Sequence, residues 1–306
     1  MRNLSNHPVR KPSLPRYFDD SSGLRSERFS EKNAHEGNGA YDRLERDRAL
    51  STWFLVSARD ERYVKEKANE LIQLGFPFTI VCGAKIDQPN VVVRPPRGKY
   101  DAINFGFSLV PKSFEITALN DVDTRVYGIE EALQEMQDSS VGLVFAAVRP
   151  EGGPQVLFYR ILDAVRSIVP IAASGELMFI RRSVLERILP LRPCKAEDSN
   201  ILFKVLELGM KAKFVTRCYV RTRRTSNKSG EFLYKRINVC GMYQALSLSR
   251  PPAIVRAFYF MLPLFSPILV CAGPVGYCWA KGIILGLVDY LRGDRTGFWT
   301  TAYMAA

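Results

Sequence analysis

Short apolar runs alternate with amphipathic stretches along the chain from residue 52 onward. The apolar runs predict strands over 52–57, 78–82, 90–93, 114–119, 141–148 and 213–219, with a strand and turn over 171–180. Apolar positions at helical spacing predict helices over 64–74, 99–109, 128–137, 159–169, 183–188 and 196–208. Because strands alternate with helices, we expect an α/β fold with a mostly parallel mixed sheet flanked by helices.

The two ends of the chain differ from this alternating region. Residues 1–49 are polar and contain no apolar run, so we expect a disordered or weakly ordered tail. Residues 257–280 carry no formal charge, and a stretch of this length is enough for one membrane helix. Residues 282–291 are again apolar. Prolines interrupt the stretch, so a bent hairpin or interfacial helices fit better than one straight span. We therefore divide the chain into a tail (1–49), an α/β domain (50–245) and a membrane-associated helical segment (246–306). A soluble helical hairpin is the alternative for the last segment.

Positive charge is concentrated just before the apolar segment. The chain has 43 Lys and Arg against 31 Asp and Glu, a formal net charge of +12. Residues 204–256 hold 12 of the basic residues and 2 of the acidic ones, which gives +10. A basic stretch directly before an apolar stretch is typical of contact with anionic headgroups or a lipid phosphate. A solvated face is the alternative. Nucleic acid is not expected as a partner, because aromatic residues are few there and no nucleic-acid motif appears.

Several kinds of chemistry are excluded by the residue types. The two histidines, His7 and His35, both lie in the polar tail, so histidine-dependent catalysis is not expected in the α/β region. The six cysteines have irregular spacing and no CxxC motif, which argues against a zinc or iron–sulfur site. Catalysis must therefore use carboxylates and basic groups, with or without a divalent cation.

Polar residues follow two of the predicted strands. The turn 58–61 follows the first strand, and Asp121-Val122-Asp123 follows the fourth. In parallel sheets, ligands bind beyond the carboxyl ends of strands. Two carboxylates one residue apart suit Mg²⁺ or Mn²⁺, which share their sites with phosphates. By itself this DxD pattern is weak, because exposed turns favour Asp anyway.

The order of the motifs is more specific than any one of them. The 58–61 turn comes first, and Gly98-Lys99 opens a helix before the DxD. Gly175-Glu176 lies in a turn, and Glu197-Asp198 begins a helix. In this order the chain resembles the family 2 glycosyltransferases, which have the GT-A fold. The resemblance covers about residues 50–245 and continues more loosely to the C-terminus.

The resemblance implies roles for individual residues. It implies that Asp123 and Asp121 contact the metal, Mn²⁺ or Mg²⁺, and that Asp198 is the general base on the acceptor hydroxyl. Asp198 could instead only cap its helix, and the two roles are compatible. The implied donor-binding residues are Ala58, Arg59, Glu61, Lys99, Asn104 and Asp121. The implied acceptor or pyrophosphate residues are Glu197, Tyr234, Lys235 and Arg236.

The chain departs from the family pattern in two places. It lacks the QxxRW element, and this absence argues against a processive synthase. Tyr234-Lys235-Arg236 lies at the corresponding position but is only a weak match. The acidic residue that usually follows the second strand and contacts the base is also missing. Here the strand ends Cys82-Gly83-Ala84-Lys85, and the next acid is Asp87. The nucleotide base therefore stays open.

The resemblance, together with the apolar C-terminal segment, implies metal-assisted, inverting transfer of a sugar from a nucleotide-sugar donor to a lipid-linked or other membrane acceptor. We expect the protein at the cell membrane, with the catalytic domain on the cytoplasmic face. A nucleotidyltransferase is one alternative, although residues 58–61 lack the glycine-rich loop of that class. A non-catalytic, membrane-anchored subunit with a degenerate site is a second alternative. A nucleic-acid-binding protein is a third, which salt-dependent binding of DNA or RNA would test.

Overall fold

The computed structural model describes residues 50–152, 155–222 and 228–297. The expected tail over 1–49 lies outside the described residues. The strands are β1 (Thr52–Ala58), β2 (Phe78–Cys82), β3 (Val91–Val93), β4 (Ile116–Asp121), β5 (Thr124–Tyr127), β6 (Val141–Pro150), β7 (Leu177–Arg181) and β8 (Lys211–Thr222). The helices are α2 (Val64–Gln73), α3 (Lys99–Phe107), α4 (Ile129–Glu135), α5 (Gln155–Arg166), α6 (Arg182–Ile188), α7 (Glu197–Glu207), α8 (Lys228–Ser247), α9 (Ala253–Phe265), the 3₁₀ helix η1 (Ser266–Ala272) and α10 (Gly273–Leu291).

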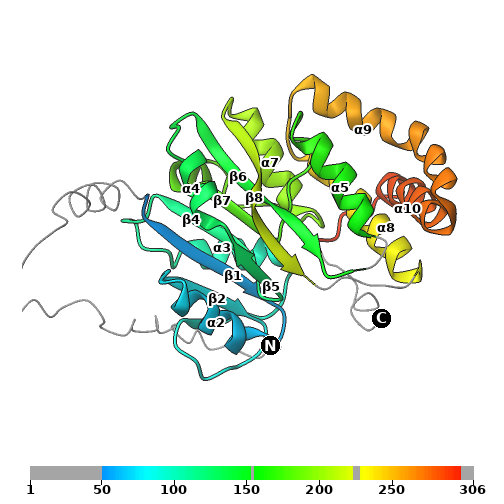
Figure 1. The fold of residues 1–306 in the computed structure, drawn as a ribbon. Helices are drawn as coiled ribbons and strands as arrows, with labels where there is room; N and C mark the ends of the chain where they lie inside the picture. The colour runs from blue at the N-terminus through cyan, green and yellow to red at the C-terminus, as the bar shows by residue number, and fades with distance from the viewer. Residues whose placement is uncertain (1–49, 153–154, 223–227, 298–306) are drawn as a thin grey trace, which may run out of the picture. The chain divides into compact units, whose positions relative to one another are not determined.

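The strands form one mixed sheet in the order β3-β2-β1-β4-β7-β6-β8-β5 (Figure 1). The pairings of β1 with β2 and β4, of β2 with β3, and of β6 with β8 are parallel. Strand β7 runs antiparallel to both of its neighbours, and β5 runs antiparallel to β8. The sheet is therefore mostly parallel and mixed, as the alternation of strands and helices predicts. One consequence matters for function. The ends of β1, β4, β6 and β8 and the starts of β5 and β7 all meet at one edge of the sheet.

Helices cover both faces of the sheet. On one face, residues of α2, α4 and α5 pack against alternate strand residues such as Phe54 and Phe179. On the other face, α3, α6, α7, α8 and α9 pack against the intervening strand residues, such as Leu55 and Phe145. The period-two alternation along each strand thus divides the core into two layers. This confirms the predicted α/β architecture.

Two local predictions differ from the structure. Strand β5 was not expected, because four residues with only two buried side chains give too short an apolar pattern to detect. A strand and turn were expected over 171–180, with Gly175-Glu176 in the turn, yet the strand begins only at Leu177 and residues 171–175 before it form a buried loop. The loop residues are apolar because they pack into the core, and Pro170 interrupts regular pairing before them.

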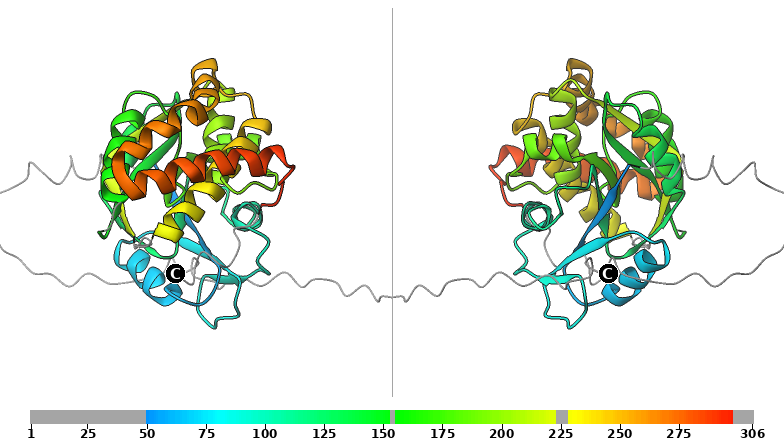
Figure 2. Two further views of the ribbon diagram at one scale, coloured as in Figure 1. Left: turned by 90° about the vertical axis from the view of Figure 1, so that its right-hand side faces the viewer. Right: turned by 90° about the vertical axis from the view of Figure 1, so that its left-hand side faces the viewer.

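The C-terminal helices pack on the α/β region. Helix α10 lies along α8, where a Cβ at Gly286 would come within 2.5 Å of the Arg236 carbonyl oxygen. Arg236 of α8 also forms a two-pronged ion pair with Asp289 of α10, with distances of 2.6 and 2.8 Å. Helix α8 runs through residue 245, so the domain boundary there stays a prediction. Figure 1 shows α9 and α10 on the opposite side of this unit from α2, and in the left view of Figure 2 α10 (red) lies in front of the sheet.

One stretch within the described residues, Ala253–Leu291, is long and apolar enough to cross a membrane. It is not one straight helix. Pro263 lies inside α9, η1 follows, and Gly273 with φ of 75° precedes the main part of α10. The chain is therefore bent at the positions where the prolines and glycines predict it.

Candidate active site

Lys99 lies at the centre of a cluster of charged side chains at the shared edge of the sheet. Its ammonium group is 2.7 Å from Oδ1 of Asp121, the last residue of β4, and 3.4 Å from Oε1 of Glu197 on α7. It also donates a hydrogen bond of 2.6 Å to the Gly175 carbonyl oxygen. Three segments distant in sequence therefore meet at one cation. The sequence-predicted residues Lys99, Asp121 and Glu197 are brought together.

The loop before β7 connects Lys99 to Asp198. The Gly175 N–H donates a hydrogen bond of 3.1 Å to Oδ2 of Asp198, while its carbonyl accepts from Lys99. A Cβ on Gly175 would lie 3.2 Å from both side chains, so the close approach favours glycine. The Ser199 N–H donates a 2.7 Å hydrogen bond to Oδ1 of Asp198. Asp198 thus satisfies one free N–H of the first turn of α7, as a helix-terminal carboxylate would.

Burial and charge change the proton affinities in this cluster. Burial alone would lower the pKa of Lys99, but the carboxylates of Asp121 and Glu197 outweigh it and raise that pKa. Burial raises the pKa of Glu197 to about 7, against the opposing effect of Lys99. Burial also raises the pKa of Asp198. A carboxylate with a raised pKa is a better proton acceptor, which suits a general base.

The turn that carries Asp121 and Asp123 is held by side chains behind it. The buried Asn120 amide donates hydrogen bonds to the Thr124 hydroxyl (2.9 Å) and to the Glu176 carbonyl oxygen (2.6 Å). The Thr124 hydroxyl in turn donates to the Asp121 carbonyl oxygen at 2.8 Å. The turn is therefore fixed by a buried network, which leaves the Asp123 side chain exposed at its tip.

Lys67 on α2 supports the same turn from inside the protein. Its side chain is 1% exposed, forms an ion pair of 2.6 Å with Glu70, and donates to the Thr124 carbonyl oxygen. Lys67 and Asn120 are not predicted from the sequence as site residues, and neither is the contact between Gly175 and Lys99. A signal for Lys67 existed, because it shares the apolar face of α2 with Val64, Ala68 and Leu71.

The turn after β1 lies at the same edge as the cluster. Ala58 ends the strand and is buried, whereas Arg59 and Glu61 are exposed. Gly83, after β2, approaches the Arg59 carbonyl oxygen so closely that a Cβ would come within 2.2 Å of it. The first two strand ends are therefore in direct backbone contact, which leaves Arg59 and Glu61 directed to solvent.

Other predicted residues are not part of the Lys99 cluster. Both ends of the Asn104 amide are engaged by the Leu191 backbone, at 2.9 and 2.7 Å. On α8, the Tyr234 hydroxyl lies 3.4 Å from that of Tyr159, and the Lys235 ammonium lies 3.1 Å from the centroid of the Phe158 ring. Arg236 faces α10 instead. Tyr234 and Lys235 therefore lie against neighbouring residues of α5, whereas Arg236 is directed to another helix.

A divalent cation fits the donor set at the DxD turn. No group of three or more His, Cys, Asp or Glu side chains that could hold a metal ion occurs within 50–152, 155–222 and 228–297. Mg²⁺ and Mn²⁺ do not need one, because one or two carboxylates plus substrate phosphates are sufficient. Asp121 contacts Lys99, and Asp123 lies exposed two residues further along the same turn. These two carboxylates would supply oxygen ligands to a divalent cation.

Comparisons with known proteins bear on the fold. No protein-family model matches the chain, and no curated protein matches it. Among solved structures, a mannosyltransferase from Pyrobaculum calidifontis, in complex with GDP-Man and Mn²⁺, is similar with a TM-score of 0.59. It is 17% identical, over 80% of this chain and 88% of that chain. The chain has a GT-A-like fold. Glucosyl-3-phosphoglycerate synthase of M. tuberculosis matches at 16% identity over 69% of this chain and 85% of that one. Its TM-score of 0.47 adds nothing to the argument.

This fold explains why the cluster lies where it does. In the GT-A-like sheet, the ends of parallel strands β1 and β4 and the start of antiparallel β7 meet at one edge. Residues from the turns after these strands must therefore converge. The likeness in fold says nothing further about the activity of this chain, because function depends on the site rather than the fold.

Proposed function

We propose that the protein is a glycosyltransferase that moves a sugar from a nucleotide-sugar donor to a membrane acceptor. The observation that carries this proposal is the Lys99 cluster, in which Asp121, Glu197 and Asp198 surround one ammonium group at the sheet edge. The mannosyltransferase with the same fold was solved with GDP-Man and Mn²⁺, which supports both the donor class and a divalent cation.

Each residue of the cluster has a distinct task in this reaction. Asp198 accepts the proton of the acceptor hydroxyl as its oxygen attacks the anomeric carbon of the sugar. The bond from that carbon to the diphosphate breaks, and attack from the opposite side inverts the configuration. Negative charge then develops on the leaving diphosphate, which Lys99 stabilises. Asp123 and Asp121 would hold Mn²⁺ or Mg²⁺, which supplies further positive charge to the diphosphate when bound.

The acceptor side of the proposal rests on the C-terminal helices. More than half of the large exposed apolar side chains among the described residues lie between Ile254 and Leu291. Phe260 is 75% exposed, and Leu264 is 65% exposed. An apolar surface of this extent, next to exposed Arg250, Arg256 and Arg292, suits an anionic membrane surface. We therefore assign a lipid-linked acceptor and a cytoplasmic-face location, where nucleotide sugars are available.

The helices favour attachment to one membrane surface over a span. One side of α10 is packed against α8, and α8 carries Lys235, Arg236 and the buried Glu231. Moving α10 into a bilayer would carry those charges along or expose the packed face. In an interfacial position, only the outward apolar side of α9, η1 and α10 enters the lipid.

The test uses the full chain in detergent with UDP-, GDP- and CMP-sugars, with and without Mn²⁺ or Mg²⁺. Thermal stabilisation and donor turnover are measured together. We expect one donor to stabilise the protein only with metal, and Asp123→Asn to lose this stabilisation. Asp138→Asn, an exposed aspartate before β6, is the matched control and should behave as the wild type.

A second variant separates chemistry from binding. Asp198→Asn should keep donor stabilisation but reduce turnover about 10²- to 10⁴-fold, the usual contribution of a general base. If no donor stabilises the wild type, and Asp123→Asn is indistinguishable from it, the transferase proposal is wrong. The non-catalytic membrane subunit would then be the better interpretation.

A further inference from the structure

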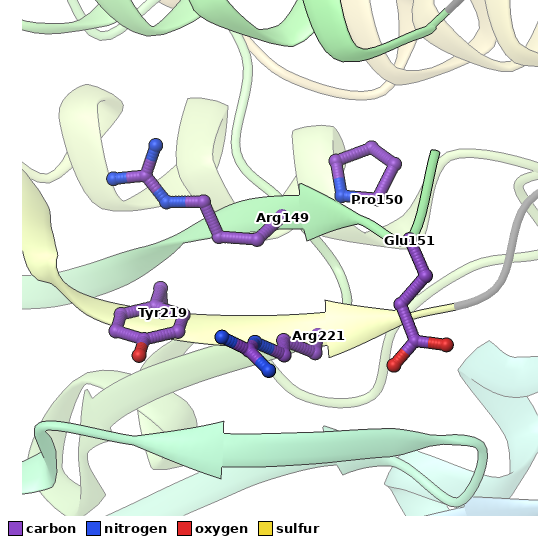
Figure 3. A pocket seen from close by; sticks show the side chains of 5 residues that line it. All are labelled: Arg149, Pro150, Glu151, Tyr219 and Arg221. Atoms are coloured by element: carbon purple, nitrogen blue, oxygen red, sulfur yellow. The ribbon is translucent and has the colours of Figure 1, made fainter. Parts of the chain in front are cut away.

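Three arginines lie directly opposite one another on adjacent strands. In the register of the sheet, Arg125 of β5 pairs with Arg221 of β8, and Arg221 pairs with Arg149 of β6. All three are exposed, while their neighbours Val126, Val220 and Val148 point into the core. Because paired residues share a face, the guanidinium groups form one row across three strands, termed here the arginine row. Figure 3 shows two of its members, Arg149 and Arg221, on adjacent strands.

Two tyrosine rings lie next to the guanidinium groups of the arginine row. Tyr127 and Tyr219 are stacked, with ring centroids 4.9 Å apart and an interplanar angle of 12°. The Arg221 guanidinium lies 5.4 Å from the Tyr127 centroid, and that of Arg149 lies 5.7 Å from the Tyr219 centroid. Arg149 also donates a hydrogen bond of 3.2 Å to the Thr216 carbonyl oxygen. The rings therefore hold the guanidinium groups in fixed positions without using all of their donors.

Within the described residues, Asp163 interacts electrostatically with Arg149, but the arginine row has no direct ion-pair partner. Like charges directly opposite each other destabilise a sheet. None of the three arginines forms an ion pair with another described residue, whereas nearby Arg217 pairs with Glu131 at 3.6 Å. Arg149, Arg221, Tyr219, Pro150 and Glu151 line a cavity of about 450 Å³. Its two arginines outnumber the one glutamate of the lining, which favours an anion.

The arginine row adjoins the candidate active site. Arg125 follows Asp123 by two residues, which limits the distance between their Cα atoms to about 7 Å. Thr124, between them, pairs with Thr222 at the end of β8. The Arg125 end of the arginine row therefore lies beside the turn at which the donor diphosphate is proposed to bind.

We propose that the arginine row binds the phosphate group of a phosphate-bearing acceptor and thereby places its hydroxyl near Asp198. The proposal rests on the proposed function, because it names a substrate class for the same site. Guanidinium groups match phosphate oxygens in pairs, and three in a row span more than one oxygen. The unfavourable repulsion within the row is offset only when such a ligand is present.

The test measures binding of citronellyl phosphate, a soluble alkyl phosphate, to the full chain in a non-ionic detergent. Arg221→Gln and Arg149→Gln should each weaken binding at least about tenfold, as expected for loss of a charge-assisted pair. Arg217→Gln is the matched control, because it removes an exposed arginine from the same strand. It should change affinity less than about twofold, and Arg221→Lys should restore part of the loss. The melting temperature of Arg221→Gln should not fall, because the substitution relieves repulsion.

The outcomes separate an acceptor phosphate from a lipid headgroup. In a parallel arm, binding to phosphatidylcholine vesicles with and without phosphatidylserine is measured for the same variants. If Arg221→Gln loses only the vesicle binding and keeps citronellyl phosphate, the row is a headgroup contact and the proposal is overturned. Equal weakening by Arg217→Gln, or no binding by the wild type, also overturns it. If citronellyl phosphate binds at the row but no nucleotide sugar stabilises the protein, the anion site stands and its acceptor role fails with the proposed function.

Discussion

At the scale of single residues, Lys99 organises the candidate active site. Its ammonium contacts Asp121, Glu197 and the Gly175 carbonyl oxygen. The Gly175 N–H in turn donates a hydrogen bond to Asp198. A lysine here balances part of the charge of several carboxylates while still offering positive charge to a diphosphate. These two interactions explain why a half-buried lysine with a raised pKa is tolerated at this end of the sheet.

The raised pKa of Glu197 predicts a dependence of stability on pH. Burial raises the pKa of Glu197 from 4.5 to about 7, so the folded protein binds this proton more tightly than the unfolded chain does. Its stabilising contribution is complete below about pH 4.5 and is lost as pH rises through about 7. Relative to the wild type, Glu197→Gln should therefore gain stability between pH 5 and pH 8, by more than about 1 kcal/mol. Urea denaturation at both pH values measures this, with the exposed Glu66→Gln as control. A constant difference across the range would contradict the prediction.

At the scale of elements, α2 braces the DxD turn through a buried ion pair. Lys67→Met leaves Glu70 and the Thr124 carbonyl without their cation, and removing one partner of a buried pair costs about 3–5 kcal/mol. We expect a large loss in the free energy of unfolding, together with weaker donor binding. Lys65→Met, an exposed lysine on the same helix, should change either quantity little. Equal stabilities of the two variants in denaturant titrations would show that the brace is unimportant.

The close contact of α8 and α10 depends on small residues. A Cβ at Gly286 would meet the Arg236 carbonyl oxygen at 2.5 Å, and one at Gly282 would meet the Lys235 Cβ at 2.7 Å. Gly286→Val should therefore separate the helices and destabilise the protein by about 1–3 kcal/mol. Ile284→Ala, on the exposed side of α10, should have a smaller effect on thermal unfolding. A destabilisation by Ile284→Ala as large as that by Gly286→Val would argue against this packing.

At the scale of the whole molecule, the apolar outer side of α9, η1 and α10 should determine membrane attachment. Each large apolar side chain fully buried in lipid contributes about 2–3 kcal/mol. Phe260→Asp combined with Leu264→Asp should therefore abolish sedimentation with phosphatidylserine-containing vesicles and leave thermal unfolding in detergent unchanged. Ile72→Asp combined with Ile168→Asp alters two equally exposed apolar residues on α2 and after α5, and should leave vesicle binding intact. If the variant with Phe260→Asp and Leu264→Asp still binds these vesicles, the assignment of this surface to membrane attachment is wrong.

Local sequence was sufficient for much of the fold and for part of the site. The strand before Asp121, the helix that begins at Glu197 and the bends in the apolar segment follow from periodicity, capping and proline positions, which act over a few residues. Strand β5 escaped detection because its stability comes from pairing with β8, about a hundred residues later in the chain. Asn104 illustrates the same limit. Its place in the motif predicts donor binding, whereas its side-chain amide forms hydrogen bonds with the backbone of Leu191, a residue distant in the sequence.

What the sequence by itself determined was the alternation of strands and helices, the carboxylates at strand ends and the apolar, basic C-terminal region. These depend on side chains near one another along the chain. Only the tertiary structure decided that Lys99 binds Asp121 and Glu197, that Lys67 braces the DxD turn, and that Arg125, Arg149 and Arg221 form a row. These contacts join residues that are distant in sequence, and they arise from sheet order and strand register. Register is set by the packing of the whole core rather than by any local pattern.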